Sequence, residues 1–595
     1  MSKPISPTVK RLRAAQRHFE LWCRHLFKHI NRFIIDRRDS LLRSRSDVVI
    51  WLVIIIGLVA LSLVQIIITN SKNTTKIAVK GGIYTEGIVG RITTINPIYA
   101  STDAEKAASA LAYPGLLNYD TQGKLRGRLA QSWSVDTTGK TWTIKLQENL
   151  KWSDGTPLTS EDVVFTINLI KNPAVQSPLN SSWRNISVTA KSPTEITLRT
   201  PTPYMSLPNA LTFGILPKHI LANQSPAEIN SISTKTPYKI VGSGALQVST
   251  VETRSKYIAW NFAINPNYYG TKPLINKFVL RVYNSQFDLI RDLKHNVINA
   301  AGNVTPDQLA RFNNKHYRII QTTTDDGVFA IFNNSSNILS NELIRQALRL
   351  GLDRDAIIAK IKPNLAGMKI PEKLETPLAP HIYSTIDQIS QPAYDKQRAN
   401  ALLNQAGWAR PSDSGVRTSN GKNLSLTVAT IKGASYAAMA NQIAAAWRDL
   451  GIEVNVKEVN PDEAQQSLLS PRAYDVLVYQ YHLGADPDQY VYWSSSETTD
   501  TGLNYANYKS RKADVLLANG RTSTERAKRI KAYTAFVNRW MADAAAIALY
   551  RPITYTINQA DTNTLPLNGQ LVDITHRFYN IGGWTVRQNS AMLTP

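Results

Sequence analysis

The stretch LKWSDGTPLTSEDVVFTINLIK carries three carboxylates close together, those of Asp154, Glu161 and Asp162. Neighbouring carboxylates can act as general acid and base, but this chemistry needs a second acid or base facing them across a cleft. The surrounding residues predict a local role instead. Asp154 precedes a glycine in a turn pair, and Thr159 with Asp162 three residues later forms a capping box before the apolar run VVFTINLI. We therefore expect a turn and a capped helix here.

The common signatures of enzymes are absent from the chain. It contains no G-x-S-x-G, H-E-x-x-H, G-x-x-x-x-G-K-[ST] or C-x-x-C motif, which excludes the commonest hydrolase, zinc and nucleotide signatures. His25 and His29 have the i, i+4 spacing of metal ligands, but no third ligand is evident. We predict no catalytic residue, no metal site and no cofactor, so the chain is expected to be a binding protein and not an enzyme.

The charge of the chain raises the question of an anionic partner. The formal net charge is +24 over 595 residues, and such a surplus is typical of proteins that meet nucleic acid or anionic membranes. Residues 1–47 hold twelve Lys or Arg and four acids, and beyond them the basic residues are dispersed, with no run of five. We predict no specific nucleic-acid partner, because a solvated basic surface explains this dispersed pattern.

An uncharged segment of 21 residues, VVIWLVIIIGLVALSLVQIII, covers residues 48–68. This length crosses a bilayer as a helix. Four arginines lie between residues 37 and 45, and only two lysines follow closely, so the positive-inside rule places the N-terminus in the cytoplasm. We predict a single-pass anchor in the cell membrane with everything beyond the linker 69–76 outside; a buried core helix is the competing interpretation. The lone cysteine, Cys23, falls on the cytoplasmic side, so the exported part can form no disulfide.

The tail before this segment has an apolar stripe. Between residues 12 and 33 apolar residues recur every three or four positions with basic residues between them. We predict a basic amphipathic helix suited to the anionic inner leaflet, or a helix that pairs with a partner in the membrane.

The exported part alternates strands and helices. In QSWSVDTTGKTWTIKLQENL the residues Trp142, Ile144 and Leu146 share one face, which predicts a hairpin, and residues 104–112 read as a helix that ends before Pro114. Later, WRDLGIEVNVKEV indicates a helix that closes at Gly451 and a strand that follows it. These alternating units predict an α/β protein.

Several segments, in one order along the chain, carry a resemblance to a known family. The most specific is GLLNYDTQGKLRGRLAQSWSVDTTGKTWTIKLQENLKWSDGTPLTSEDVVFT; the others are GGIYTEG, GSGALQV, IRQALRLGLDRDAI, YDKQRANALLNQAGW, WRDLGIEVNVK, YDVLVYQYHLGADPDQY and IALYRP. The exported part resembles the extracytoplasmic solute-binding proteins of peptide ABC transporters, the oligopeptide- and dipeptide-binding type of family 5. The segments span most of residues 80–555.

The resemblance implies a two-lobed clamp of the periplasmic-binding-protein kind, an α/β fold with an extra small α/β domain, preceded here by one transmembrane helix. Hinges near Asn333 and Tyr550 would let the lobes close on a ligand. The expected division is a basic cytoplasmic tail at 1–47, the anchor at 48–68, the linker at 69–76, lobe I at 77–120, 236–325 and 546–595, its extra domain at 121–235, and lobe II at 326–545.

The same resemblance implies a ligand site. In the family an acidic residue meets the α-amino group of a bound peptide, and Asp486 of GADPDQY stands at that position. Asp488 is a nearby competitor, a turn role for Asp486 is the structural alternative, and Leu483 stands where the family often has Trp. Aromatic residues around the motif could line side-chain pockets or belong to the core; we take as ligand-binding candidates Tyr479, Tyr481, Tyr490 and Trp493.

The function implied is capture of short peptides outside the cytoplasm and their delivery to ABC transporter permease subunits. The long basic tail leaves open a second possibility, a ligand-sensing receptor that signals through it. The family resemblance also extends to binders of nickel complexes, haem or sugars, so a non-peptide solute is a third.

Overall fold

The structure of the protein is a computed structural model. It describes Lys28 and residues 45–592 apart from 121, 230–239, 313–314, 362, 364, 413–414, 565–569 and 587. The chain divides into two compact units, one formed by residues 78–588 and the other by residues 1–77 with 589–595. The basic helix predicted within residues 1–47 and the pair His25 and His29 lie outside the described residues.

The smaller unit contains one long helix, α3 (Arg45–Asn73), and the strand β1 (Thr74–Ala78), which pairs with β23 (Gln588–Met592). The described side chains of α3 are exposed. Among the described residues, no helix has the length and apolar composition that crossing a membrane requires. The transmembrane helix predicted over residues 48–68 is therefore not supported by this part of the structure.

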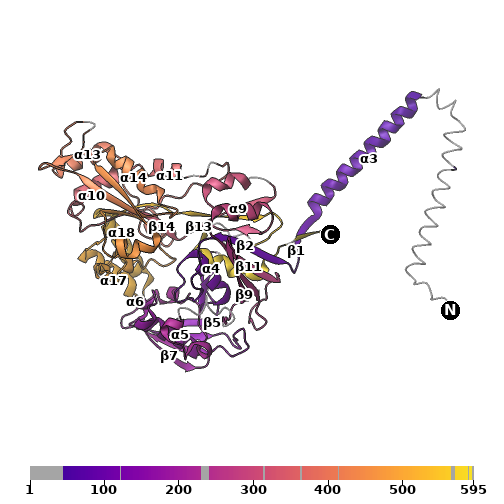
Figure 1. The fold of residues 1–595 in the computed structure, drawn as a ribbon, viewed down its shortest axis with the longest axis horizontal. Coiled ribbons are helices and arrows are strands. Elements are labelled where there is room, and N and C mark those ends of the chain that lie inside the picture. Colours follow the sequence, from indigo (N-terminus) through magenta and orange to yellow (C-terminus); the bar gives the residue numbers. More distant parts are fainter. Residues whose placement is uncertain are drawn as a thin grey trace. The chain divides into compact units, whose positions relative to one another are not determined.

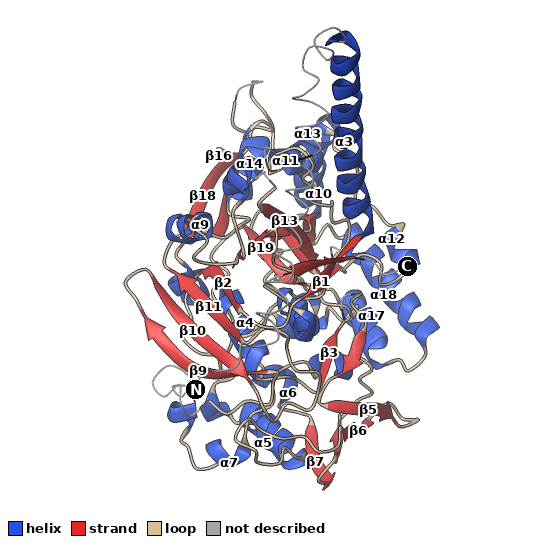
Figure 2. Cartoon of the chain, turned by 90° about the vertical axis from the view of Figure 1, so that its right-hand side faces the viewer, coloured by secondary structure: helices blue, strands red, loops and turns tan. Residues whose placement is uncertain are grey.

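The larger unit is built on two main sheets. The first, which defines what we call the first lobe, has eight strands. Its strand β11 runs parallel to β2 and antiparallel to β10, and Figure 2 shows β9, β10 and β11 side by side. The order across the sheet is β22 (Gln570–Leu571), β13 (Tyr317–Thr324), β21 (Ile553–Gln559), β12 (Ala300–Ala301), β2 (Ile83–Val89), β11 (Lys277–Tyr283), β10 (Tyr257–Ile264) and β9 (Leu246–Thr253).

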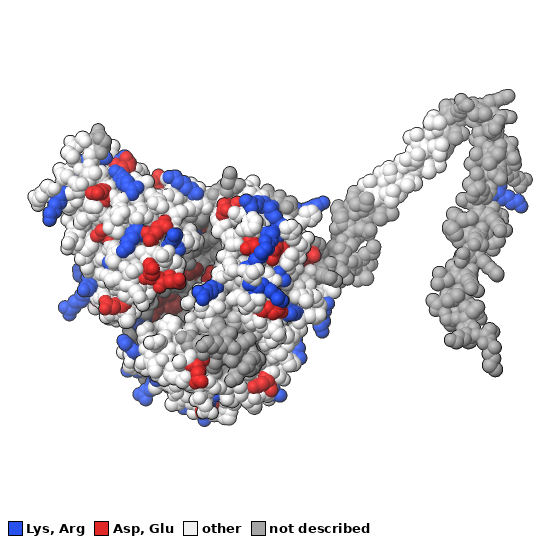
Figure 3. Space-filling model, in the orientation of Figure 1, with Lys and Arg blue, Asp and Glu red and all other residues white. Residues whose placement is uncertain are grey.

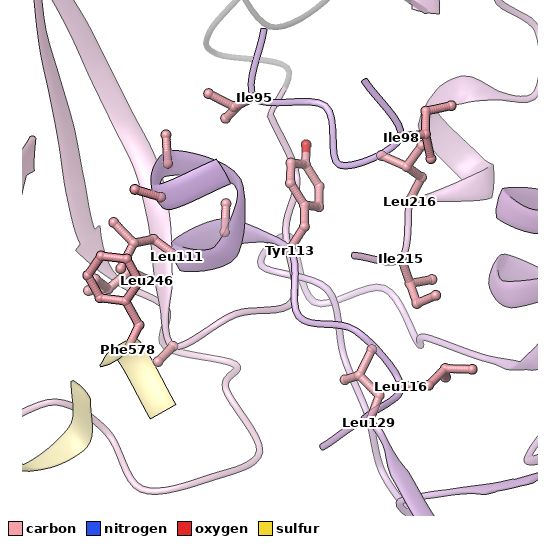
Figure 4. Close-up of a cluster of buried hydrophobic side chains, with 14 of the residues drawn as sticks. Ile95, Ile98, Leu111, Tyr113, Leu116, Leu129, Ile215, Leu216, Leu246 and Phe578 are labelled. Atoms are coloured by element: carbon pink, nitrogen blue, oxygen red, sulfur yellow. The ribbon is translucent and has the colours of Figure 1, made fainter. Parts of the chain in front are cut away.

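Segments far apart in sequence build the core of the first lobe. Helix α4 (Asp103–Ala112) begins at a capping box of Thr102 with Glu105. It ends before Pro114, as the sequence predicted. Figure 4 shows Leu111 of α4 beside Leu246 of β9 and Phe578 of η8 (Ile574–Gly583), and all three are buried. This packing joins the two ends of the larger unit to its middle, because burying apolar surface from all three stabilises them together.

A four-stranded antiparallel sheet lies within residues 121–235, the segment that we call the extra domain, with the order β5 (Ala130–Val135), β6 (Thr141–Leu146), β8 (Glu195–Arg199) and β7 (Ser187–Ser192). The predicted hairpin is confirmed as β5 and β6, and Trp142, Ile144 and Leu146 are its buried face. Helices α5 (Ser160–Lys171), α6 (Asn180–Trp183) and α7 (Lys218–Leu221) lie in the same part of the chain; α5 and α6 are labelled in Figure 1 and α7 in Figure 2.

The acidic stretch at the start of α5 has the local role that its sequence predicts. The capping box is confirmed: Asp162 Oδ2 accepts the Thr159 N–H at 2.9 Å, and Asp162 Oδ1 accepts the Lys218 N–H at 2.9 Å. Asp154 accepts the Thr156 N–H at 3.0 Å and lies 2.8 Å from His219 Nε2. Burial raises the pKa of Asp162, although these backbone hydrogen bonds oppose the shift.

The second main sheet, which defines the second lobe, has five strands in the order β18 (Glu453–Val459), β17 (Ser425–Ile431), β19 (Val476–His482), β14 (Asp326–Phe332) and β20 (Ala546–Tyr550). Successive side chains of a strand point to opposite faces. On β14, Val328, Ala330 and Phe332 pack on one face of the sheet, and Phe329 and Ile331 on the other. The strand is buried on both faces, so both must be covered by helices.

The helices of the second lobe provide this cover. One face is covered by α10 (Glu342–Leu350), α11 (Arg354–Lys360), α13 (Lys396–Gln405) and α14 (Ala438–Arg448), and the other by α17 (Arg511–Thr522) and α18 (Arg526–Ala542). Helix α14 and strand β18 are joined through Gly451 at φ +82°, as predicted. This sandwich of helices and a mixed sheet is the α/β arrangement that the sequence predicted.

Short elements complete the described part of the larger unit. They are β3 (Leu117–Tyr119), β4 (Leu125–Gly127), β15 (Thr418–Ser419), β16 (Lys422–Asn423), α9 (Gln286–Lys294), α12 (Ser384–Asp387), α15 (Pro461–Ala464), α16 (Tyr490–Trp493), η2 (Pro173–Val175), η3 (Leu207–Ala210), η5 (Pro306–Phe312), η6 (Gln465–Leu469) and η7 (Ser495–Glu497).

The structural role of the acidic stretch predicts a stability effect. Asp162→Ala should lower the free energy of unfolding by about 1–3 kcal/mol. The Asp162 carboxylate is buried, and its loss leaves the Thr159 and Lys218 N–H groups without their acceptor. Chemical denaturation measures this change. Glu161→Ala is the matched control, since that side chain is 56% exposed and pairs only with Lys218 at the surface; it should change stability by less than about 0.5 kcal/mol. Equal losses in both variants would contradict the capping role.

Candidate functional site

The chain crosses between the two main sheets twice. The first crossing is Asp325, between β13 and β14, and the second is Arg551 with Pro552, between β20 and β21. The sequence predicted hinges near Asn333 and Tyr550, so the second lies where the pattern indicated and the first lies earlier. The first crossing leads into β14 and the second leads out of β20. These two strands pair with each other in the second lobe, so the crossings lie side by side at one end of its sheet.

The two crossings are tied to each other by a buried ion pair. Arg551 Nη2 donates to Asp325 Oδ1 at 3.0 Å and to the Thr324 carbonyl at 3.1 Å, while Nη1 donates to Glu372 at 3.0 Å. The Arg551 side chain is 1% exposed and that of Asp325 is 8% exposed. The Asp325 carbonyl also accepts the Leu483 N–H at 2.8 Å, which joins the crossing to the loop that carries the predicted site.

That loop holds Asp486 in contact with another domain. Ser206 Oγ donates to Asp486 Oδ1 at 2.7 Å, and Asn209 Nδ2 donates to Asp486 Oδ2 at 3.3 Å. Within the second lobe, Arg529 Nη2 lies 3.1 and 3.2 Å from the two carboxylate oxygens, and the Asp488 N–H donates to Oδ1 at 3.0 Å. The predicted site residue therefore lies where the second lobe meets the extra domain, and its carboxylate already has several donors.

Asp488, the competitor named from the sequence, makes a second acid–arginine pair. Arg521 Nε donates to Asp488 Oδ2 at 2.8 Å, and the guanidinium lies over the rings of Tyr490 and Tyr204, at 4.2 and 5.2 Å from their centroids. Burial raises the pKa of Asp488, although the charge of Arg521 opposes that shift. Burial alone lowers the pKa of Arg529, but Asp486 together with Tyr533 and Tyr383 outweighs burial, so the pKa of Arg529 is raised.

The four aromatic candidates are placed differently from one another. Tyr490 lies at the domain contact beneath Arg521. Tyr481 and Trp493 are 2% and 0% exposed and belong to the core of the second lobe, where their rings also contact each other. Tyr479 is partly buried on the same strand and packs against Tyr505. The ligand-binding role of Tyr481 and Trp493 stays a prediction that this packing does not support.

A further group of charges lies near the crossings. His482 Nδ1 is 2.9 Å from Asp326 Oδ1; burial lowers the pKa of His482, but this carboxylate outweighs burial, so the pKa is raised. On η8 of the first lobe, burial lowers the pKa of His576 to about 4. Burial raises the pKa of Asp573, yet Lys106 and the two histidines bring it down to about 2. Charges from both lobes therefore act on one another here.

Sequence reasoning missed the partners of Asp486. Ser206 and Asn209 lie in the segment MSLPNA, and Arg529 lies on α18. Neither segment carries a motif that indicates a binding site. Hydrogen bonds between residues 280 positions apart leave no periodic signal, so no feature of the single sequence identified them.

Comparison with known proteins agrees with this architecture. The family model described as "Bacterial extracellular solute-binding proteins, family 5 Middle" matches residues 124–502, more than half of the chain. The chain belongs to the bacterial extracellular solute-binding proteins of family 5. Its resemblance to this family, inferred from the sequence, is confirmed, and so is the prediction that it is a binding protein and not an enzyme, because members of the family bind solutes.

Individual relatives of this family 5 protein are moderately similar in sequence. The oligopeptide-binding protein AppA of Bacillus subtilis is 26% identical over 515 residues, which cover 85% of this chain and 92% of AppA. The nickel-binding periplasmic protein of Escherichia coli is 25% identical over 417 residues, covering 67% and 75% of the two chains.

Solved structures share the fold. AppA from Bacillus subtilis in complex with a nonapeptide matches with a TM-score of 0.72 at 24% identity, covering 86% of this chain and 99% of AppA. NikZ from Campylobacter jejuni in complex with Ni(L-His) matches with a TM-score of 0.71 at 23% identity, covering 84% and 99%. The two-lobed periplasmic-binding-protein fold is therefore confirmed.

The pair at the crossings predicts a large effect on stability. Arg551→Met should lower the free energy of unfolding by about 3–5 kcal/mol, because it removes the buried cation that faces Asp325. Urea denaturation followed by tryptophan fluorescence measures the change. Lys396→Met is the control, since it breaks an ion pair with Asp449 whose side chains are 40% and 63% exposed; we expect a change below about 1 kcal/mol. A small effect of Arg551→Met would mean that the crossings do not depend on this pair.

Proposed function

We propose that this family 5 protein captures short peptides between its two lobes outside the cytoplasm and delivers them to the permease subunits of an ABC transporter. The proposal includes closure of the second lobe onto the first lobe and its extra domain, with Asp325 and Arg551 at the hinge. Closure of two domains around a ligand is an established mode of binding.

The observation that carries this proposal is the polar contact across the domains. The loop after β19 reaches the extra domain through Ser206 and Asn209, while among the described strands the backbone passes from one main sheet to the other at two places. Such an arrangement can open and close as two bodies. Figure 3 shows the surface hollowed between the part formed by the second lobe and the part formed by the first. The oligopeptide-binding relative that spans most of the chain supports peptides as the ligand class.

The family resemblance implies that Asp486 contacts a peptide's α-amino group, and this contact is one of two alternative proposals for that carboxylate. A carboxylate and an ammonium group that are desolvated together can stabilise a complex. In the structure Asp486 has Arg529 at 3.1 Å, so an arriving ammonium group would have to displace this arginine or share the carboxylate with it. A ligand that contacts the ring of Tyr490 would likewise have to displace Arg521, whose guanidinium covers this ring.

A nickel complex is the second candidate ligand, because a nickel-binding relative and a structure with Ni(L-His) are both similar to this chain. Among the described residues, no group of three or more His, Cys, Asp or Glu side chains is placed to hold a metal ion. The candidate therefore concerns a preformed complex whose other ligands come with it.

The membrane anchor over residues 48–68 belongs to this proposal as well. Its support is the run of 21 uncharged residues in the sequence, a length that crosses a bilayer as a helix. An anchor of this kind would keep the binding lobes close to the permease.

The ligand class can be tested directly. Full-length protein purified in mild detergent should release a mixture of short peptides on denaturation, identified by mass spectrometry, and contain no stoichiometric nickel by elemental analysis. A homogeneous preparation carrying a single non-peptide compound, or nickel at one equivalent, would refute the peptide proposal.

The anchor predicts a fractionation result. The protein should stay with the membranes after extraction at alkaline pH, because a span of 21 uncharged, mostly apolar residues in a bilayer is not released by loss of charge interactions. Replacing Ile54, Ile55 and Ile56 by lysine should move it to the soluble fraction, since each charge at the centre of a span is costly. Replacing the exposed Lys512, Lys528 and Lys531 by alanine is the control. Release of the unaltered chain would contradict anchoring by residues 48–68.

A further inference from the structure

The contact between Asp486 and the extra domain has an unusual distribution of charge. Asp486 and Arg529 both belong to the second lobe, one on the loop after β19 and the other on α18, and they form an ion pair with side chains 18% and 12% exposed. The groups that meet them from the extra domain, Ser206 and Asn209, are neutral. Both charges of the pair therefore come from one lobe, and the extra domain adds no charge through these two residues.

Ser206 fits between the two charges. Its hydroxyl donates to Asp486 Oδ1 at 2.7 Å and accepts from Arg529 Nη2 at 3.2 Å. One hydroxyl can do both because it has one hydrogen to donate and lone pairs to accept. The side chain is 3% exposed in this contact, so both of its interactions are made away from water.

Asn209 is oriented for the same carboxylate. Its Nδ2 atom donates to Asp486 Oδ2 at 3.3 Å, while its Oδ1 atom accepts the hydroxyl of Tyr119 at 2.5 Å. The Tyr119 hydroxyl thereby fixes which end of the amide faces Asp486. With the Asp488 N–H and Arg529 also donating, the carboxylate is nearly saturated, since two oxygens accept about four hydrogen bonds.

Neighbouring contacts align the same two surfaces. The Met205 N–H donates to the Arg521 carbonyl at 3.5 Å, a backbone bond between the extra domain and α17. Gly139, in the turn between β5 and β6 at φ +71°, approaches Thr524 so closely that a Cβ atom there would lie 2.7 Å from the Thr524 methyl. A larger residue at Gly139 could not keep this approach.

We propose that Asp486, Arg529, Ser206 and Asn209 form a closing latch between the second lobe and the extra domain, and that Asp486 is not the partner of a peptide's α-amino group. Closing the latch brings neutral donors to an ion pair that is already neutralised, which avoids the cost of desolvating two separated ions. The latch favours the closed form, and a larger closed fraction strengthens the apparent affinity for every ligand by the same factor.

This inference deepens the proposed function. It depends on that function only for the statement that the ligand is a peptide. If the latch is correct, the N-terminal charge of a peptide is not read at Asp486, so peptides with free and with acetylated N-termini are bound alike with respect to this residue. If Asp486 meets the ammonium group, its loss weakens only the free peptides.

The first test measures closure without any ligand. Spin labels are attached at Lys191→Cys of the extra domain and Lys512→Cys of the second lobe, both exposed positions, in full-length Cys23→Ser protein in detergent, and their distance distribution is recorded. Ser206→Ala and Asp486→Asn should shift the population toward longer distances. Lys396→Met, which breaks an exposed ion pair within the second lobe, should leave it unchanged. Unchanged distributions in both latch variants would overturn the proposal.

The second test measures binding to an equimolar library of synthetic pentapeptides, prepared with free and with acetylated N-termini. Ser206→Ala and Asp486→Asn should weaken both libraries by a similar factor, about tenfold, because each removes a hydrogen bond of a charged group that forms on closure. Loss confined to the free library would assign Asp486 to the ammonium group and overturn the latch. If the unaltered protein binds neither library, the peptide proposal fails, while the distance measurement still decides the latch.

Discussion

The ion pair between Arg551 and Asp325 is the interaction on which the arrangement of the lobes depends. The two sheets are connected through two short crossings, and this pair joins one to the other at 3.0 Å with almost no exposure to water. A buried pair of this kind is costly to break, because removing one partner leaves a desolvated charge. The pair therefore holds the two crossings together at one place.

Charge pairing recurs where the second lobe meets the extra domain. Asp486 with Arg529 and Asp488 with Arg521 are each complete within the second lobe, and the extra domain contributes a hydroxyl, an amide, an aromatic ring and backbone groups to them. Closing such a surface exchanges water for neutral hydrogen-bond partners. If these ions were unpaired, closure would need an opposite charge from the ligand. Because each acid is already paired with an arginine, closure at this position needs no charge from the ligand.

The acids at the start of α5 resemble a catalytic cluster in sequence but have structural roles. Asp154, Glu161 and Asp162 are neighbours in sequence, yet each has a partner within the same small domain: a turn, a surface lysine and two backbone N–H groups. Their proximity serves the start of one helix. The acids that face another domain, Asp486 and Asp488, lie more than three hundred residues later.

The local structure followed from the sequence by itself. The hairpin of β5 and β6, the capped helix α5 and the glycine at 451 depend on residues within one turn or one strand of each other, so their patterns are visible in a short window. The family resemblance and the binding role also came from ordered sequence segments. The tertiary structure alone decided the surroundings of Asp486, the burial of Tyr481 and Trp493, and the pairing of Arg551 with Asp325. The physical reason is the separation of the partners: 280 residues divide Ser206 from Asp486, and 226 divide Asp325 from Arg551, and contacts over such distances are set by how sheets and helices pack, which leaves no trace in the spacing of a single chain.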